Sequence, residues 1–372
     1  MSLMRSLVFL LIGLFLAAPL RAATVQIAAT NQRLAIQNAI DASKPGDTVY
    51  FAEGLHTPGG QITFRSGRTY SGKPGATVLR FEKLEFGVTI EADAHDVTVT
   101  GITFRGAGID MGGGGPTSRY TNIRIVGNEF RDIDTNAIKC TIPNDGLVIE
   151  RNSFTNVRGY GCIEIYHMNR GSYSHNTFVD CMHGGHILGP LDDCNFSFNR
   201  GTGLTHMGLE IQRSGNSISH NMTVEGNVFY DWKLPFCNSF GLSVVAEQGI
   251  NTRVINNYLR ASRVGAWNPN LEGQGERFGI GIEAGFDSGI VEGNVIGGPF
   301  AHYITASGQK MLFRNNRFFG KPVWGSPMAR WPGVHGKGTF IDQDNAWDRD
   351  FAKMPEPPQA TEPRAETRGD AR

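Results

Sequence analysis

Four ionisable residues occupy equivalent places in four short, β-branched segments of the chain. They are Lys139, Glu164, His186 and Glu210, and each lies next to an aliphatic residue that would point the opposite way from a strand. Two carboxylates, an imidazole and an ammonium can together supply a general acid, a general base and groups that tune their pKa values. This chemistry requires a framework that brings the four segments side by side.

A recurring motif predicts that framework. The motif is a small strand, an asparagine, any residue and then phenylalanine or a close relative, and it begins at Asn128, Asn152, Asn176, Asn227, Asn256, Asn294 and Asn316. The first three asparagines are 24 residues apart. A fixed period of this length, built from β-branched strands, is typical of a solenoid. We expect the asparagines to bond one another along the stack, and Phe130, Phe154, Phe178 and Phe229 to stack in the core.

Each coil is predicted to hold three strands, so that the fold is all-β with a helical cap at its N-terminal end. In the coil of Asn152 the strands are 147–150, 154–157 and 162–166. A helix over 32–42 is expected to cover the first coil, whose strand edges would otherwise be exposed. The predicted organisation is a signal peptide at 1–22, an N-terminal cap at 23–50, the solenoid at 51–320, a C-terminal cap at 321–352 and a disordered tail at 353–372.

The first residues and the charge indicate where the protein works and what it binds. Residues 1–22 have the positive start, apolar core and small last residue of a secretory signal, which predicts a periplasmic or secreted protein. No later apolar run is long enough for a membrane span. The signal contains Arg5 and Arg21 and no acid, so the rest of the chain is slightly acidic, which argues against a nucleic-acid partner.

The cysteines give little sign of chemistry. They are Cys140, Cys162, Cys181, Cys194 and Cys237, an odd number without a CxxC pair, which argues against a zinc site. We expect them to serve as small buried side chains, with Cys140 and Cys181 pointing inward.

The opening AIQNAIDASKPGDTVYFAEGLH, from Ala35, and the Asn-x-Phe bends resemble the pectin-lyase-like superfamily of right-handed parallel β-helices. The resemblance covers residues 30–320 and implies that fold. Members include polysaccharide lyases, hydrolases, epimerases and phage tailspikes, and the strand after the loop that follows the ladder usually carries their site. The sequence lacks the paired Asp and Gly-His-Gly set of polygalacturonases and the Asp clusters of calcium-dependent pectate lyases.

That resemblance points to the segments 137–141, 162–166, 185–189, 208–212, 241–245 and 279–283. Alternation then gives two columns of outward side chains. The first column is predicted to contain Lys139, Glu164, His186, Glu210, Ser243 and Gly281, and the second Thr141, Tyr166, Leu188, Gln212, Val245 and Glu283.

Hydrolysis of a glycosidic bond is the reaction that these columns favour. Glu164 and Glu210 are two coils apart, which places their backbones ~9.6 Å apart. Inverting glycosidases hold two carboxyl groups about 6.5–9.5 Å apart so that a water fits between them. One Glu would be the general acid and the other would activate water, while His186 and Lys139 would orient hydroxyls or tune pKa values.

Two alternatives stay open. In a lyase or C5 epimerase of a uronate polymer, Lys139 or His186 could be the base and Tyr166 or His183 the proton donor, and the two glutamates could hold calcium. A third possibility is a polysaccharide-binding protein without catalysis. The hydrolytic mechanism needs no cofactor and no metal.

The expected partner is a polysaccharide or oligosaccharide, and the protein is expected to be a monomer. Tyr166, Gln212, His183 and Glu283 are candidate substrate-binding residues. Trp267 joins them as a surface on which a sugar could stack, and Trp232 is a second candidate of this kind.

Overall fold

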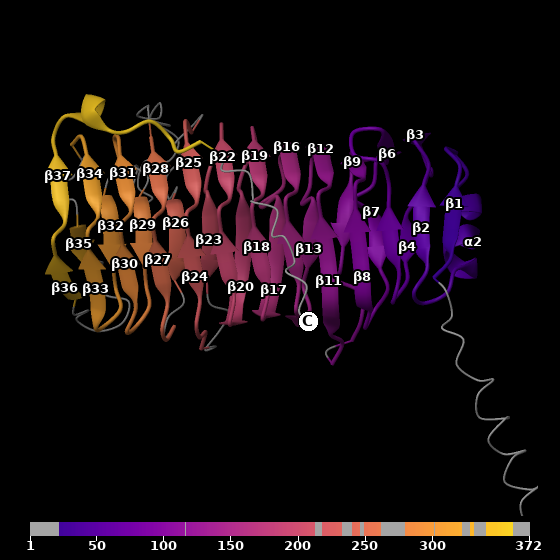
Figure 1. Cartoon of the computed structure of the whole chain (residues 1–372), viewed down its shortest axis with the longest axis horizontal. Helices are drawn as coiled ribbons and strands as arrows, with labels where there is room; N and C mark the ends of the chain where they lie inside the picture. The colour runs from indigo at the N-terminus through magenta and orange to yellow at the C-terminus, as the bar shows by residue number, and fades with distance from the viewer. Residues whose placement is uncertain are drawn as a thin grey trace, which may run out of the picture.

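Short parallel strands run the length of an elongated solenoid, three to a coil (Figure 1). The computed structural model describes residues 22–115, 117–212, 218–232, 240–245, 249–261, 280–300, 302–321, 328–330 and 340–359. Each coil adds one strand to each of three stacks, and neighbours within a stack pair in parallel. The fold is therefore the predicted right-handed parallel β-helix.

The three stacks are named here by their order within a coil, counted from the strand that precedes the asparagine bend. The first stack contains β1 (Thr24–Ile27), β2 (Thr48–Phe51), β5 (Thr69–Ser71), β8 (His95–Thr100), β11 (Tyr120–Val126), β15 (Val148–Glu150), β18 (Ser172–Ser174), β21 (Asn195–Ser197), β24 (Thr223–Glu225), β27 (Arg253–Ile255), β30 (Ile290–Glu292), β33 (Met311–Arg314) and β36 (Phe340–Gln343). The second stack contains β3 (Gly54–His56), β6 (Thr77–Arg80), β9 (Thr103–Arg105), β12 (Glu129–Ile133), β16 (Ser153–Val157), β19 (Thr177–Val179), β22 (Arg200–Thr202), β25 (Val228–Tyr230), β28 (Tyr258–Arg260), β31 (Val295–Gly297), β34 (Arg317–Phe319) and β37 (Ala346–Asp348).

The third stack carries the column of ionisable residues. It contains β4 (Ile62–Phe64), β7 (Phe86–Ile90), β10 (Gly108–Asp110), β13 (Ile138–Cys140), β17 (Ile163–Asn169), β20 (Gly185–Asp192), β23 (Leu209–Gln212), β26 (Phe240–Val245), β29 (Ile280–Ala284), β32 (His302–Ala306) and β35 (Met328–Arg330). The short strand β14 (Asn144–Asp145) pairs with both β11 and β17, and so joins the first and third stacks.

A ladder of buried asparagines holds the coils together at the bend between the first and second stacks. Asn176 shows the pattern, because its Oδ1 accepts hydrogen bonds from the backbone N–H and the Nδ2 of Asn152 at 3.0 and 3.2 Å. Its own Nδ2 donates to the carbonyl of Ile149 at 2.9 Å and to Oδ1 of Asn199 at 3.0 Å. The predicted ladder is confirmed, and each rung satisfies backbone groups that have no strand partner.

The ladder differs from the prediction at three rungs. Asn257, not Asn256, holds the ladder position. Asn256 is the residue before it and has a left-handed backbone conformation, with φ 57°. Asn199 and Asn345 also belong to the ladder, although neither begins an Asn-x-Phe motif. Asparagine tolerates the left-handed region better than most residues, so an Asn-Asn pair can fill both places.

Removing one rung tests how much the ladder stabilises the solenoid. We expect Asn176→Ala to lower the free energy of unfolding by roughly 2–5 kcal/mol, because the backbone N–H of Asn152 and the carbonyl of Ile149 lose buried partners. Urea unfolding followed by circular dichroism measures the change. Thr177→Ala alters an exposed neighbour and serves as the control. Equal midpoints for the two variants would contradict the structural role of the ladder.

Aromatic rings and small side chains fill the interior. Phe104, Phe130, Phe154 and Phe178 stack with centroids 5.0–5.2 Å apart, and Phe229 is buried, as predicted. The cysteines Cys140, Cys162, Cys181 and Cys194 are buried with free thiols, and Cys237 lies outside the described residues. The core therefore runs the length of the molecule.

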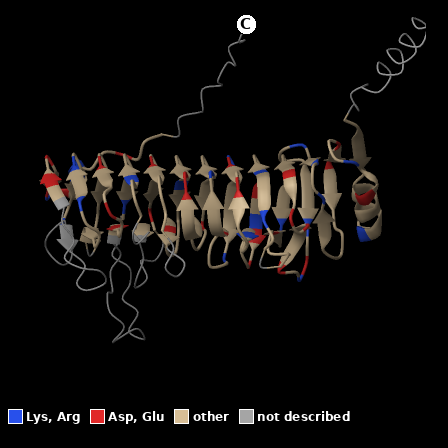
Figure 2. Cartoon of the chain, turned by 90° about the horizontal axis from the view of Figure 1, so that it is seen from below, with Lys and Arg blue, Asp and Glu red and all other residues tan. Residues whose placement is uncertain are grey.

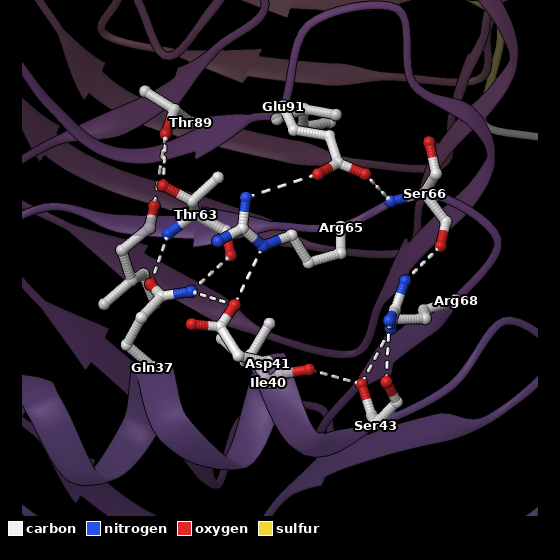
Figure 3. Close-up of polar contacts among 12 residues, drawn as sticks. Gln37, Ile40, Asp41, Ser43, Thr63, Arg65, Ser66, Arg68, Thr89 and Glu91 are labelled. Carbon is white, nitrogen blue, oxygen red and sulfur yellow. Dashed lines mark hydrogen bonds and ion pairs between the residues drawn. The ribbon is translucent and has the colours of Figure 1, made fainter.

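Helix α2 (Arg33–Ala42) closes the N-terminal end, as the sequence predicts. Its Gln37 accepts from the Thr63 N–H at 2.8 Å and donates to the Thr63 carbonyl at 3.2 Å, so one amide replaces the missing strand beside β4. Figure 3 shows this contact, together with Asp41 bonded to Arg65 at 2.8 Å and Arg65 bonded to Glu91 at 3.3 Å. The helix thereby covers the strand edges that an open solenoid would expose.

The C-terminal end departs from the predicted limits. Strand pairing does not stop at residue 320, because β36 pairs with β33 and β37 with β34. The 3₁₀ helix η2 (Phe351–Lys353) follows, and Met354 packs with Val228, Tyr258 and Phe319. Residues 353–359, predicted as disordered, run back along the second stack (Figure 1), where the Tyr258 hydroxyl donates to the Pro355 carbonyl at 2.8 Å.

Charged residues of both signs are interspersed along the solenoid (Figure 2). A search of the described residues for a helix long and apolar enough to cross a membrane found none.

Candidate functional site

The third stack places the predicted ionisable residues in one column. Lys139 pairs in register with Glu164, Glu164 with His186, and His186 with Glu210. Glu210 pairs in turn with Ser243, so the register predicted from alternation is correct over these coils. Five successive coils thus contribute one residue each to the first column, namely Lys139, Glu164, His186, Glu210 and Ser243.

The column differs from the prediction at both ends. Ser243 pairs with Glu283 and not with Gly281, which moves Glu283 from the second column to the first. The reason is that Leu242 pairs with Ile282 and not with Ile280, and alternation cannot distinguish two positions that point the same way. At the other end, Asp110 pairs with Lys139 and extends the column by one coil.

The second column is confirmed from Tyr166 to Val245, and Glu283 does not belong to it. Tyr166 pairs with Leu188, and Leu188 pairs with Gln212. Tyr166 and Gln212 each lie two residues after a glutamate of the first column, and each donates a hydrogen bond to that glutamate. The two columns therefore act together around Glu164 and Glu210.

Three donors surround the Glu164 carboxylate, which is 8% exposed. The Tyr166 hydroxyl donates to Oε1 at 2.7 Å, and the Asn136 amide donates to Oε2. The Lys139 ammonium lies 3.5 Å from Oε2. An amide, a phenol and an ammonium thus contact the two oxygens of one carboxyl group.

The environment of Glu210 is different. It is 3% exposed, its Oε1 accepts from Gln212 Nε2 at 2.6 Å, and its Oε2 has no hydrogen-bond partner. Burial, followed by the charge of Glu283, raises the pKa of Glu210 to about 7, against opposing contacts with Gln212 and Tyr160. Near neutral pH a large fraction of Glu210 is therefore a carboxylic acid, and Oε2 is the oxygen free to carry the proton.

Two neutral imidazoles lie beside Glu210. His183 Nδ1 lies 3.8 Å and His186 Nε2 lies 3.9 Å from Glu210 Oε2. Burial, with the neighbouring His206 and His186, lowers the pKa of His183 to about 2, and burial lowers the pKa of His186. The Nδ1 atoms of both rings are buried without a hydrogen-bond partner. His206 stacks on His183 with ring centroids 4.4 Å apart.

Several residues of the site were not predicted from the sequence. Tyr160 packs on both imidazoles, Asn136 bonds Glu164, and His206 contacts His183. These three lie in loops before strands of the third stack, where no periodicity predicts which way a side chain points. Asp110 is the last residue of β10, which was not predicted because a Gly-rich stretch follows it directly. The only sequence signal was the location of these loops next to the predicted column.

The predicted tryptophans do not join the described site. Trp232 is 6% exposed and packs edge-on against Phe300 at 6.0 Å, so it is a core residue and not a sugar-stacking surface. Trp267 lies outside the described residues. A search of the described residues found no group of three or more His, Cys, Asp or Glu arranged to hold a metal ion.

The parallel β-helix of the chain is similar in fold to several solved structures. It covers 86% of its length and 92% of the A-module of mannuronan C-5 epimerase AlgE4 from Azotobacter vinelandii, at a TM-score of 0.63 and 15% identity. A GH87 α-1,3-glucanase catalytic domain with tetrasaccharides matches at a TM-score of 0.55 and 13% identity, over 88% of this chain and 70% of that one.

The tailspike of Escherichia coli bacteriophage HK620, in complex with a pentasaccharide, matches at a TM-score of 0.54 and 15% identity. That match covers 85% of this chain and 62% of the tailspike. No protein-family model matches the sequence, and no curated protein matches it either. The structural matches confirm the predicted parallel β-helix fold.

Proposed function

We propose that the protein hydrolyses a glycosidic bond of a polysaccharide with inversion, Glu210 acting as the general acid and Glu164 as the general base. One observation carries the proposal, namely the contrast between two buried carboxyl groups in one column. Glu210 has a pKa of about 7 and an unpartnered Oε2, whereas donors from Tyr166, Asn136 and Lys139 surround Glu164. Environments that differ in this way assign the acid and base roles of a carboxyl pair.

The spacing of the pair supports inversion. His186 lies between the two glutamates in the register, so they are two coils apart, or ~9.6 Å along the stack. Side chains that lean together come within the range of about 6.5–9.5 Å that leaves room for a water. Oε1 of Glu164 accepts one hydrogen bond, from Tyr166, and keeps a lone pair to take a proton from that water.

The charge of the column favours a polysaccharide without carboxylates. Among its described residues, from Asp110 to Glu283, Lys139 is the only lysine or arginine, and it already pairs with Glu164. A uronate would bring its carboxylate next to Glu164 and Glu283 without a free ammonium to balance it. Similar folds that act on or bind saccharides support the broader class of substrate.

Product analysis tests the proposed reaction. Purified protein is incubated with a panel of neutral and uronate polysaccharides, and the products are analysed by mass spectrometry. We expect saturated fragments from a neutral polymer. The mass of each fragment should equal that of its sugar residues within the polymer plus one water. Unsaturated fragments would instead establish elimination, and the absence of any product across the panel would favour a binding protein.

The raised pKa of Glu210 predicts the pH dependence of the reaction. A general acid must be protonated, so we expect kcat/KM to fall as the pH rises through about 7, tenfold per pH unit above it. A profile of kcat/KM between pH 5 and 9 measures this fall, which is the alkaline limb of the profile. In Glu210→Gln the limb should disappear from the residual activity. An alkaline limb that persists in this variant would assign the acid to another group.

C5 proton abstraction is a second candidate, because two neutral imidazoles present unpartnered Nδ1 atoms in the site. Their lowered pKa values keep them deprotonated but also make them weaker bases, and the AlgE4 module shares the fold. This reaction on a uronate polymer in D₂O would introduce deuterium at C5 without shortening the chain. Proton NMR of the recovered polymer distinguishes that outcome from hydrolysis.

A further inference from the structure

One exposed aromatic ring lies over the buried polar groups of the site. Tyr160 exposes 48% of its surface, whereas His183, His186 and Glu210 expose 0%, 8% and 3%. The centroid of its ring lies 4.8 Å from each of the two imidazole rings, tilted by 43° on His183 and edge-on at 83° to His186. The ring therefore separates these groups from solvent.

The atoms that a substrate would need are closed off beneath this ring. Nδ1 of His183, Nδ1 of His186 and Oε2 of Glu210 each have less than 1 Å² of accessible area and no hydrogen-bond partner. A glycosidic oxygen cannot receive a proton from Glu210 in this arrangement. Within the described part of the chain, Tyr160 is the exposed ring that contacts both imidazoles.

The backbone on either side of Tyr160 packs closely against neighbouring backbone atoms. A Cβ on Gly159 would lie 2.2 Å from the Thr135 carbonyl carbon, and one on Gly161 would lie 2.8 Å from the Ile163 carbonyl oxygen. Glycine at both positions permits this approach. Rotation of the Tyr160 side chain is the smallest movement that would uncover the site.

We propose that Tyr160 is a specificity-determining residue that covers Glu210 in the empty site and, when it rotates outward, supplies the flat surface on which one pyranose ring of the substrate stacks. The role rests on the proposed function, since it assigns a sugar-binding surface to that same site. A tyrosine suits both states, because its ring buries a large apolar area while its hydroxyl stays in contact with water or polar groups. The ligand is thus a pyranose that presents a C–H face beside the scissile bond.

Binding measured without turnover tests the stacking role. Isothermal titration calorimetry is carried out on Glu210→Gln with the hexasaccharides of α-1,3-glucan, β-1,4-glucan and β-1,4-mannan. Adding Tyr160→Ala should weaken the Kd of the hexasaccharide that binds by at least about tenfold, whereas adding Tyr160→Phe should change it by less than about twofold. Phe198→Ala is the matched control, because Phe198 is 47% exposed and packs on His175 at 5.1 Å away from the column.

The covering role has its own readout, which needs no ligand. Burial is the largest cause of the raised pKa of Glu210, whereas the contact with the Tyr160 hydroxyl lowers it. Tyr160→Ala should therefore lower that pKa relative to Tyr160→Phe, measured by NMR of ¹³C-labelled glutamate, and Phe198→Ala should leave it at the wild-type value. An unchanged Kd in Tyr160→Ala, together with a pKa equal to that in Tyr160→Phe, would overturn the proposal. Failure of all three hexasaccharides to bind would overturn both the stacking role and the proposed function, whereas binding without cleavage by the wild-type protein would overturn the proposed function alone.

Discussion

Replacing Glu210 with glutamine is expected to lower kcat on the polysaccharide substrate about 10²–10⁴-fold, the usual contribution of a general acid. Glutamine keeps the volume of the side chain, and its carbonyl can still accept the hydrogen bond from Gln212 Nε2. It cannot protonate a leaving oxygen. Because the wild-type carboxyl group is buried and carries a raised pKa, the neutral amide should leave the fold intact.

The leaving group distinguishes this loss from a general disturbance of the site. An aryl glycoside with a nitrophenol leaving group needs little protonation, so Glu210→Gln should lose far less activity on it than on the polysaccharide. The matched control is Glu150→Gln, which changes a carboxylate bonded to Ser172 in the first stack and should leave both activities unchanged. An equal loss on both substrates would show that Glu210 is not the acid.

Replacing Glu164 with glutamine is the second large effect that we expect, again about 10²–10⁴-fold in kcat. Here the loss should be the same for the polysaccharide and for the aryl glycoside, because activation of water is needed whatever the leaving group. Circular dichroism and thermal unfolding should stay close to wild type, because the glutamine carbonyl can accept the Asn136 hydrogen bond and its amide can donate to the Tyr166 oxygen. The pair with Lys139, which is 30% exposed, stabilises little. Substantial turnover in both Glu164→Gln and Glu210→Gln would contradict the hydrolase assignment.

Periodicity predicted the fold because the forces that define it repeat in every coil. The asparagine bends and the stacked rings recur at one spacing, and the alternation of buried Ile138 or Ile163 with outward Lys139 or Glu164 fixes which side chains share a face. The same logic failed where two choices give the same pattern. A shift of two residues keeps every side chain on its face, which is why Glu283 was assigned to the wrong column.

The rest of the site was not predictable from the repeat. Tyr160 and Asn136 reach the glutamates from loops whose course depends on close backbone packing, as at Gly159 and Gly161, and not on strand alternation. The unequal surroundings of Glu164 and Glu210 come from such contacts, so the sequence identified both carboxyl groups but could not assign their roles. The ordered stretch near Met354 likewise depends on contacts with the second stack, far away in sequence.

The stereochemistry of the first product tests the central claim most directly. Proton NMR follows the anomeric signals during the first minutes of hydrolysis, before mutarotation equilibrates the two forms. A pair of carboxyl groups separated by two coils predicts that the new reducing end appears with the configuration opposite to that of the cleaved bond. Retention of configuration, or a product without a new reducing end, would contradict the assignment of Glu210 as acid and Glu164 as base.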